Sequence, residues 1–212
     1  VNRRSKYILV ELSHGETMIM HLGMSGRVLI HQGKAQNNHK NFYSNQPEIE
    51  KHDHVIFDFE EGIRVVYNDP RRFGAIDVCK SMELGTHKMI SNLGIEPLSN
   101  QFNADFLFEK FKGSKTTIKA ALLNQRHVCG LGNIYVCEAL WRSGISPLKL
   151  AGQIKINKIE LLTTAIRKVL LEAISSGGSS LKDFKNTEGA LGYFQHNFNV
   201  YDSEGNSCKT AG

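Results

Sequence analysis

The chain has 212 residues, 41% of them hydrophobic and 22% charged, which is the composition of an ordinary globular protein and excludes disorder as the default. No apolar run reaches the roughly 18 residues that a membrane helix needs, and no signal-peptide pattern is present. The net charge of +5 favours a polyanionic partner. The scattered cysteines indicate reduced thiols rather than a disulfide framework: they are Cys79, Cys129, Cys137 and Cys208.

The first part of the chain has the alternating pattern of short β-strands. Strands are expected at residues 6–12, 17–22, 27–31, 54–59, 63–68 and 75–79. Tight turns at 13–16 and 60–62 make hairpins of their neighbours, and the polar residues 33–50 have the composition of an exposed loop. Short strands joined by such turns predict an antiparallel sandwich or barrel, with a domain boundary near residues 80–85.

From residue 86 onward the apolar spacing becomes helical. Helices are expected at 86–93, 104–111, 119–123, 158–174 and 181–185, with one more beginning after Asn133. Asn133 is predicted to be the N-cap of that helix, and Asn157 with Glu160 a capping-box start for the longest one. Residues 199–201 are expected to be strand-like.

Residues 119–147 combine a glycine-rich turn with flanking cations. Gly130 and Gly132 leave backbone N–H groups bare just before a helix, and a helix start of this kind is a ready anion site. Lys119, Arg126 and His127 add positive charge. The alternative is an ordinary helix–loop–helix core with a glycine-rich connection, because GxGN without a preceding strand is a weak nucleotide signal.

Two loops of the β part also have two interpretations. Met24 stands between glycines, and residues 68–74, NDPRRFG, place Arg71 and Phe73 in one turn. Met24 and Phe73 could fill a small local core while the arginines are solvated. Alternatively, apolar wedges and arginines enter a duplex and fill the space left by a displaced base. The two interpretations differ in what the apolar tips face.

Taken together, a series of motifs resembles bacterial formamidopyrimidine-DNA glycosylases over essentially the whole chain: RRSKYILVEL, HLGMSG, KHDHV, NDPRRFGA, LGNIY, SGISP, GGSSLKDF and GYFQHNFNVY. The resemblance implies an α+β fold of two domains. An incomplete antiparallel β-sandwich would occupy residues 1–82, a helical domain with a helix–two-turn–helix motif 83–198, and the start of a zinc-finger hairpin 199–212.

The same resemblance implies an activity. Such enzymes excise oxidised purines, 8-oxoguanine and formamidopyrimidines, from double-stranded DNA and then cut the strand as abasic-site lyases. The expected partner is therefore duplex DNA that contains an oxidised purine or an abasic site, and no membrane. A monomer in the bacterial cytoplasm, associated with the nucleoid, is expected.

Roles for individual residues also follow from the resemblance. Lys6 matches a lysine used in catalysis near the damaged nucleotide, although read alone it would be a surface lysine at a strand end. The matches to phosphate ligands are His21, Lys119, Asn133 and Tyr201. The matches to the trio that fills the gap and contacts the orphaned base are Met24, Arg71 and Phe73.

Two further matches concern a histidine and a loop. His52 matches a DNA-contacting position, whereas His52 and His54 read alone are an i, i+2 pair on one strand face, either a metal pair or plain polar residues. The loop that closes over the extruded base is matched by Glu188, Gly189, Gly192 and Tyr193, and its glycines suit such motion.

The chain also departs from the family pattern. Members begin with a Pro-Glu pair whose proline amine is the nucleophile, and this chain starts later in the pattern, so an inactive internal fragment is expected. Members usually end in a four-cysteine zinc finger; here Cys208 matches the first ligand and Ala211 stands at the second. No cofactor is expected in this chain, and one structural zinc in complete members. The alternatives are a non-catalytic protein that binds damaged DNA and a product without a stable fold.

Overall fold

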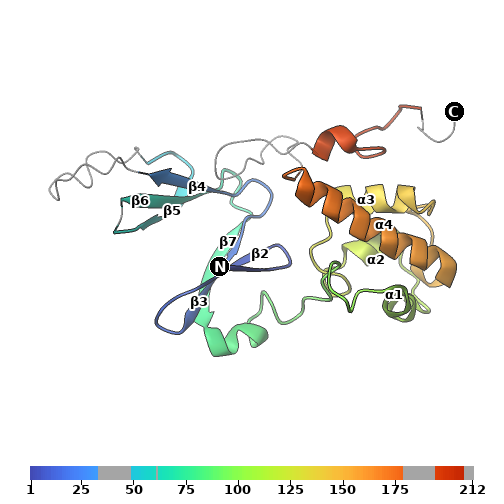
Figure 1. Ribbon diagram of the computed structural model, residues 1–212, viewed down its shortest axis with the longest axis horizontal. Helices are drawn as coiled ribbons and strands as arrows, with labels where there is room; N and C mark the ends of the chain where they lie inside the picture. Colours follow the sequence, from blue (N-terminus) through green and yellow to red (C-terminus); the bar gives the residue numbers. More distant parts are fainter. Residues whose placement is uncertain (33–48, 61, 179–193, 208–212) are drawn as a thin grey trace.

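The computed structural model describes residues 1–32, 49–60, 62–178 and 194–207. A β part lies beside a helical part, and the chain passes from one to the other after strand β7 (Figure 1). None of the described helices combines the length and the hydrophobicity that crossing a bilayer requires.

The β part consists of two antiparallel sheets. The first has the order β1-β2-β3-β7, formed by Asn2–Arg4, Tyr7–Glu11, Glu16–His21 and Ala75–Lys80. The second has the order β4-β6-β5, formed by Arg27–Gln32, Ile63–Asn68 and Asp53–Asp58. The predicted strands and the antiparallel sandwich are thereby confirmed, with β1 in addition. Alternation of side chains buries Leu9 between half-buried neighbours, and Thr17 and Ile19 are buried on either side of the half-buried Met18, while Val66 and Tyr67 are buried in succession.

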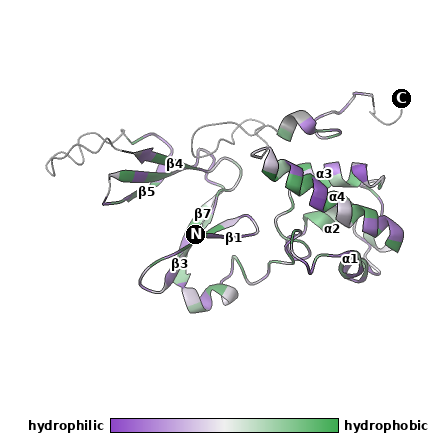
Figure 2. Ribbon diagram, in the orientation of Figure 1, coloured by the Kyte–Doolittle hydropathy of each residue, from purple (hydrophilic) through white to green (hydrophobic). Residues whose placement is uncertain are grey.

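The helical part is built around one hydrophobic core. Its helices are α1 (Ala104–Phe111), α2 (Ile118–Leu123), α3 (Asn133–Arg142) and α4 (Ile156–Ser175). Short 3-10 turns are η1 (Ser81–Thr86), η2 (Ala151–Gln153) and η3 (Phe194–Asn197). Hydrophobic and hydrophilic residues alternate along α4, as a helix with one apolar face requires (Figure 2). Leu140, Leu162 and Val169 lie fully inside the shared core.

The prediction of a helix at 86–93 is wrong. This segment forms successive turns, such as the bond from Ile90 N to His87 O, and then docks on the chain that follows α2. Gly94 N donates to Gln125 O at 2.8 Å, and a side chain on Gly94 would collide with His127 O. Tertiary contact therefore overrides a short helical pattern.

Three further local predictions are also corrected. The N-cap of α3 is Gly132, and Asn133 is already helical. Helix α4 starts after Lys155 without a side-chain cap, so Asn157 lies inside it and makes no capping box. Residues 199–201 form a bend and turn rather than a strand, because their N–H groups bond to a carboxylate instead of a sheet. The predicted helix at 181–185 lies outside the described residues.

Candidate nucleic-acid interface

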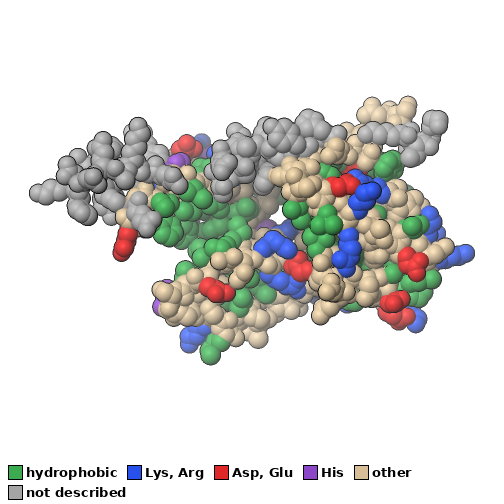
Figure 3. Space-filling model, in the orientation of Figure 1, with side chains coloured by type: hydrophobic (Ala, Val, Ile, Leu, Met, Phe, Trp, Pro, Cys, Tyr) green, Lys and Arg blue, Asp and Glu red, His purple; other side chains and the backbone are tan. Residues whose placement is uncertain are grey.

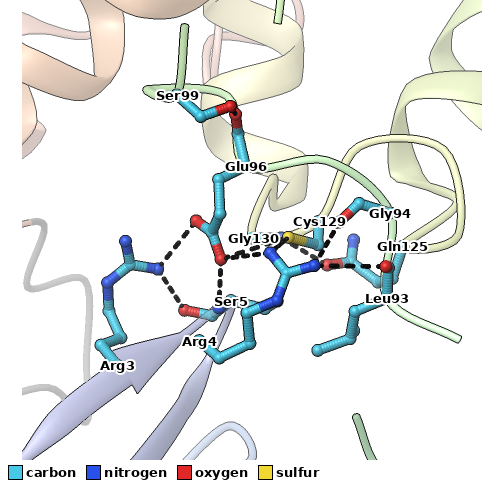
Figure 4. A network of polar contacts seen from close by, with 10 residues as sticks. All are labelled: Arg3, Arg4, Ser5, Leu93, Gly94, Glu96, Ser99, Gln125, Cys129 and Gly130. Carbon is cyan, nitrogen blue, oxygen red and sulfur yellow. Dashed lines mark hydrogen bonds and ion pairs between the residues drawn. The ribbon is translucent and has the colours of Figure 1, made fainter. Parts of the chain in front are cut away.

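A carboxylate from the helical part holds the turn between β1 and β2. Ser5, in this turn, has φ 55°, and its N–H donates to Glu96 Oε1 at 2.6 Å (Figure 4). Arg4 Nη1 donates to the same oxygen at 2.8 Å, and Arg3 Nη1 donates to Oε2 at 3.1 Å. The left-handed backbone of Ser5 is thus stabilised by an acceptor that lies 91 residues away.

The same network buries a thiol. The Cys129 S–H donates to Glu96 Oε1 at 3.3 Å, and Arg4 Nη2 donates to Gly94 O at 2.7 Å. Burial, with the charge of Glu96, raises the pKa of the Cys129 thiol to about 11. Burial alone would raise the pKa of Glu96, but the N–H of Ser5 and the arginines outweigh it and lower that pKa.

Lys6 follows Ser5 and reaches the glycine-rich turn before α3. Its Nζ donates to Leu131 O at 3.1 Å, and the same carbonyl accepts from Gln125 Nε2 at 2.9 Å. Gln125 Oε1 in turn accepts from Gly130 N at 2.8 Å. Desolvation lowers the pKa of the Lys6 amine below its usual value. An amine with a lowered pKa therefore stands where the two parts meet, suited to moving a proton.

His21 lies beside Lys6 at the end of β3. Its ring packs on Tyr7 of the paired strand with centroids 4.9 Å apart, and its Nδ1 accepts from Gly23 N at 3.1 Å. Because Nδ1 is an acceptor, the neutral ring carries its proton on Nε2 and can donate it to a ligand oxygen. Burial, and then the charge of Lys6, lower the pKa of His21.

The apolar tips of the two β-part loops face solvent. Met24 is 68% exposed and Phe73 58%, so the interpretation as a small local core is wrong. The guanidinium of Arg71 stacks over Phe73, with 4.8 Å from its central carbon to the ring centroid. Large apolar side chains that project in this way, next to an arginine, have the form of wedges for a stack of bases.

The N-terminus of α3 supplies backbone donors. Gly132 gives no side-chain cap, and Asn133 is exposed in the first turn, so the first N–H groups of this helix are unoccupied by a capping side chain. Helix α2 packs against α3 and carries the half-buried Lys119. This arrangement fits an anion at the helix start.

A buried carboxylate joins α3 to the loop that contains Tyr201. Glu138 is 0% exposed, and its Oε1 accepts from the N–H groups of Val200 at 2.9 Å and Tyr201 at 3.1 Å. Asn199 donates to it through both its backbone and its side chain. Sequence reasoning missed Glu138, although one charged residue inside the apolar run VCEALW was a usable signal.

The remaining predicted residues do not lie at the helix start or at the loop tips. His52 precedes β5 and is half-buried, and its carbonyl accepts from Asp69 N at 3.0 Å. His54 Nε2 lies 2.8 Å from Asp69 O, and no three candidate metal ligands gather in the described part of the chain. Glu188–Tyr193 and Cys208 lie outside the described residues.

Basic side chains gather where the β part and the helical part meet (Figure 3). A two-sheet domain with solvent-facing wedges and a helical domain with an uncapped helix start define a two-domain DNA-binding protein of the α+β class. Residues 1–76 match the family model of the formamidopyrimidine-DNA glycosylase N-terminal domain, and residues 93–185 match that of the formamidopyrimidine-DNA glycosylase H2TH domain. The chain belongs to the formamidopyrimidine-DNA glycosylase family.

Individual relatives agree with this assignment. The formamidopyrimidine-DNA glycosylase of Dinoroseobacter shibae is 56% identical over 210 residues, which are 99% of this chain and 73% of that protein. The one from a Ruegeria species is 50% identical over 100% of this chain and 74% of its own. Among solved structures, a Lactococcus lactis Fpg variant with DNA containing Fapy-dG has a TM-score of 0.86 and 32% identity, covering 100% of this chain and 73% of that one. The Lactococcus lactis Fpg with DNA containing an abasic site has a TM-score of 0.85, also at 32% identity and with the same coverage.

Proposed function

We propose that this protein acts in base-excision repair as an N-glycosylase that removes oxidised purines from duplex DNA and cuts the strand as an abasic-site lyase. One observation of the structure carries the proposal. The amine of Lys6 meets the glycine-rich turn before α3, with Nζ 3.1 Å from Leu131 O, at the junction of a wedge-bearing and a helical domain. The solved relatives contain DNA with Fapy-dG or an abasic site, which supports the same class of ligand for this chain.

Each predicted residue has a physical role in this proposal. His21 Nε2, Lys119, the start of α3 at Asn133, and Tyr201 would hold phosphates around the extruded nucleotide. Met24, Phe73 and Arg71 would fill the space that the nucleotide leaves.

Lys6 would act next to the reacting sugar. Desolvation lowers the pKa of its amine, which suits a group that accepts and returns a proton. We place this activity in a monomer in the bacterial cytoplasm, at chromosomal DNA, and assign residues 1–82 and 83–198 as its two domains.

The proposed chemistry does not use the structural zinc of the family. Cys79 lies on β7, Cys129 lies before α3 and Cys137 lies within α3, and these described thiols form no ligand group. Cys208 is a single thiolate of the four ligands that structural zinc requires.

The function is tested on three duplexes: one undamaged, one with a single 8-oxoguanine, and one with a tetrahydrofuran abasic analogue. We expect tighter binding to both lesions, and release of 8-oxoguanine with strand cleavage by a chain that carries the Pro-Glu pair of the family. Binding without lesion preference and without excision refutes the proposal. Lesion preference without excision identifies a non-catalytic protein that binds damaged DNA.

The phosphate ligands are tested separately by Lys119→Ala. Loss of one phosphate contact should weaken binding to every duplex alike and reduce the slope of log K against log salt by about 0.9. Lys110→Ala, an exposed lysine on α1, is the matched control for the loss of one positive charge. An unchanged slope in Lys119→Ala, or an equal change in both variants, contradicts the assignment of Lys119.

A further inference from the structure

The two wedge loops, residues 23–26 and 69–74, are joined by a buried carboxylate to which the proposed function assigns no role. Asp69 is 1% exposed, although it lies between loops whose tips, Met24 and Phe73, point into solvent. A carboxylate buried in this way needs hydrogen bonds on both oxygens to offset its desolvation. The donors of these hydrogen bonds therefore show which parts of the chain Asp69 holds in place.

Two of the hydrogen bonds that Asp69 accepts come from residues that directly follow a wedge residue. Oδ1 accepts from Ser25 Oγ at 2.6 Å, and Ser25 directly follows Met24. Oδ2 accepts from Gly74 N at 2.9 Å, and Gly74 directly follows Phe73. Ser25 Oγ also accepts from Arg71 N at 3.2 Å, so all three members of the wedge trio are connected to this one group.

The two loops also touch without intervening side chains. A Cβ added to Gly23 would lie 2.5 Å from the carbonyl carbon of Phe73 and 2.7 Å from Gly74 N. Arg72, between the wedge residues, has φ 56°, a left-handed conformation that costs energy for a residue other than glycine. Its N–H donates to Asp69 O at 3.3 Å. A strained, close-packed arrangement persists only where the surrounding bonds hold it.

The charge state of Asp69 suits this task. Burial by itself raises its pKa, but the hydrogen bonds from Ser25, Gly74 and Tyr67 outweigh burial and lower that pKa below the ordinary value. The Tyr67 O–H donates to Oδ2 at 3.2 Å and comes from β6, which ties both loops to the sheet. An ionised acceptor with donors from both loops and from a strand makes one rigid unit of them.

We propose that Asp69 is a positioning residue that holds Met24, Arg71 and Phe73 as one preformed wedge before DNA arrives. The inference rests on the proposed function, since it concerns how the same surface enters a damaged duplex. Ordering two loops during binding would cost free energy, and a preformed wedge avoids that cost. Its affinity for the distorted site is therefore higher than that of two flexible loops. Asp69 touches no substrate in this account and acts through the loops.

The test is Asp69→Asn, which keeps the size of the side chain. An asparagine offers one acceptor oxygen, and its NH2 group faces donors, so at least one of Ser25, Tyr67 and Gly74 loses its acceptor. The probe is a duplex with a tetrahydrofuran abasic analogue and 2-aminopurine in the opposite strand, where fluorescence reports entry of the wedge. For Asp69→Asn we expect affinity for this duplex to fall about tenfold, and most of the fluorescence change to be lost, while binding to undamaged DNA changes less than about twofold.

Controls separate the possible failures. Asp58→Asn is the matched control: Asp58 lies at the end of β5 and pairs with Arg64, away from the wedge loops. This variant should bind both duplexes as the wild type does. Ser25→Ala removes one of the bonds and should show part of the loss, without adding to the loss in Asp69→Asn. Ser25→Ala also serves if Asp69→Asn fails to fold.

The outcomes are distinct. If the wild type shows no preference for the abasic duplex, the proposed function fails. If the wild type shows the preference and both Asp69→Asn and Ser25→Ala keep its full affinity and fluorescence change, the positioning role of Asp69 is refuted. A loss of affinity that is equal on damaged and undamaged DNA also refutes it, because general destabilisation would not select the lesion.

Discussion

Removal of the Glu138 carboxylate should destabilise the protein more than any surface change on the same helices. The carboxylate lies inside α3, fully buried, and accepts from three consecutive backbone N–H groups at Asn199, Val200 and Tyr201 as well as from the Asn199 side chain. In Glu138→Ala these donors lose their acceptor and the 199–201 segment loses its attachment to α3.

The expected magnitude follows from the bonds. Each hydrogen bond to a charged group contributes about 1.5–3 kcal/mol, and desolvation of the carboxylate offsets part of the sum. Each buried N–H group left without its acceptor costs about 1–3 kcal/mol, so for Glu138→Ala we expect a destabilisation of about 3–5 kcal/mol. Glu138→Gln keeps one acceptor oxygen and should destabilise by about 1–2 kcal/mol.

The pH dependence supplies a second signature. Burial raises the pKa of Glu138, but the N–H groups of Val200, Tyr201 and Asn199 outweigh it and lower that pKa below its ordinary value of about 4.3. The carboxylate therefore stabilises the fold above the unfolded-state pKa, and this contribution is lost as pH falls through the lower folded-state pKa. The difference between wild type and Glu138→Ala should be full at pH 7 and shrink below about pH 4.

The assay is urea denaturation at pH 7 and at several acidic pH values, with Glu160→Ala, an exposed residue of α4, as the control. Binding to the abasic-analogue duplex is measured on the same variants, because Glu138 sets the position of Tyr201 relative to Asn133 at the start of α3. A stability of Glu138→Ala within about 0.5 kcal/mol of wild type would refute the reasoning, since that is the range of ordinary surface substitutions.

Two further predictions concern the junction and the glycines. At pH 8, Glu96→Gln should speed labelling of the Cys129 thiol by a soluble reagent about tenfold, because loss of the Glu96 charge lowers a pKa of about 11 and loosens the network around it. Labelling of the half-buried Cys137 is the internal control, and an unchanged Cys129 rate contradicts the argument. Gly74→Ala should destabilise by about 2 kcal/mol or more, because its Cβ would lie 2.5 Å from His21 O and closer still to the Tyr67 hydroxyl. Gly85→Ala, with nothing within 4 Å, should change the free energy of unfolding by less than about 0.5 kcal/mol, and equal losses in urea denaturation would show that crowding is not the cause.

Periodicity was sufficient for most of the fold because burial follows it. The alternation in residues 7–11 and 16–21 is the same alternation that buries Leu9 and Ile19. Strand β1 is absent from the prediction because Asn2–Arg4 has no apolar residue, and pairing with β2 and the bonds to Glu96 hold it instead. The segment at 86–93 forms local turns instead of a helix, and the residues directly after it, Gly94 and Ile95, bond to Gln125 and His127.

The sequence likewise reveals some residues of the candidate site and not others. Met24 stands out in the sequence as a large apolar residue between glycines, whereas Lys6 read alone is a surface lysine at a strand end and is assigned through the family resemblance. Among the carboxylates, only Glu138 gives a local signal, as a charge inside an apolar run. Asp69 and Glu96 give none, since an acidic residue is most often solvated and its partners lie far along the chain. Asn199 N, for example, is 61 residues from Glu138. No local pattern encodes a bond of that separation.

Three buried or half-buried carboxylates repeat one physical solution in this protein. Glu96 accepts from the N–H of Ser5 beside Lys6, Asp69 from that of Gly74 beside Phe73, and Glu138 from that of Tyr201. A surface meant for a polyanion cannot be held by exposed acids, because they would repel the phosphates. The hydrogen bonds to Asp69 and Glu138 come from uncharged donors of the protein, such as Ser25 and Tyr201, and one carboxylate can accept about four of them. Glu96 differs, because it also pairs with Arg3 and Arg4. Asp69 and Glu138 therefore place negative charge beneath the surface without pairing with its lysines and arginines.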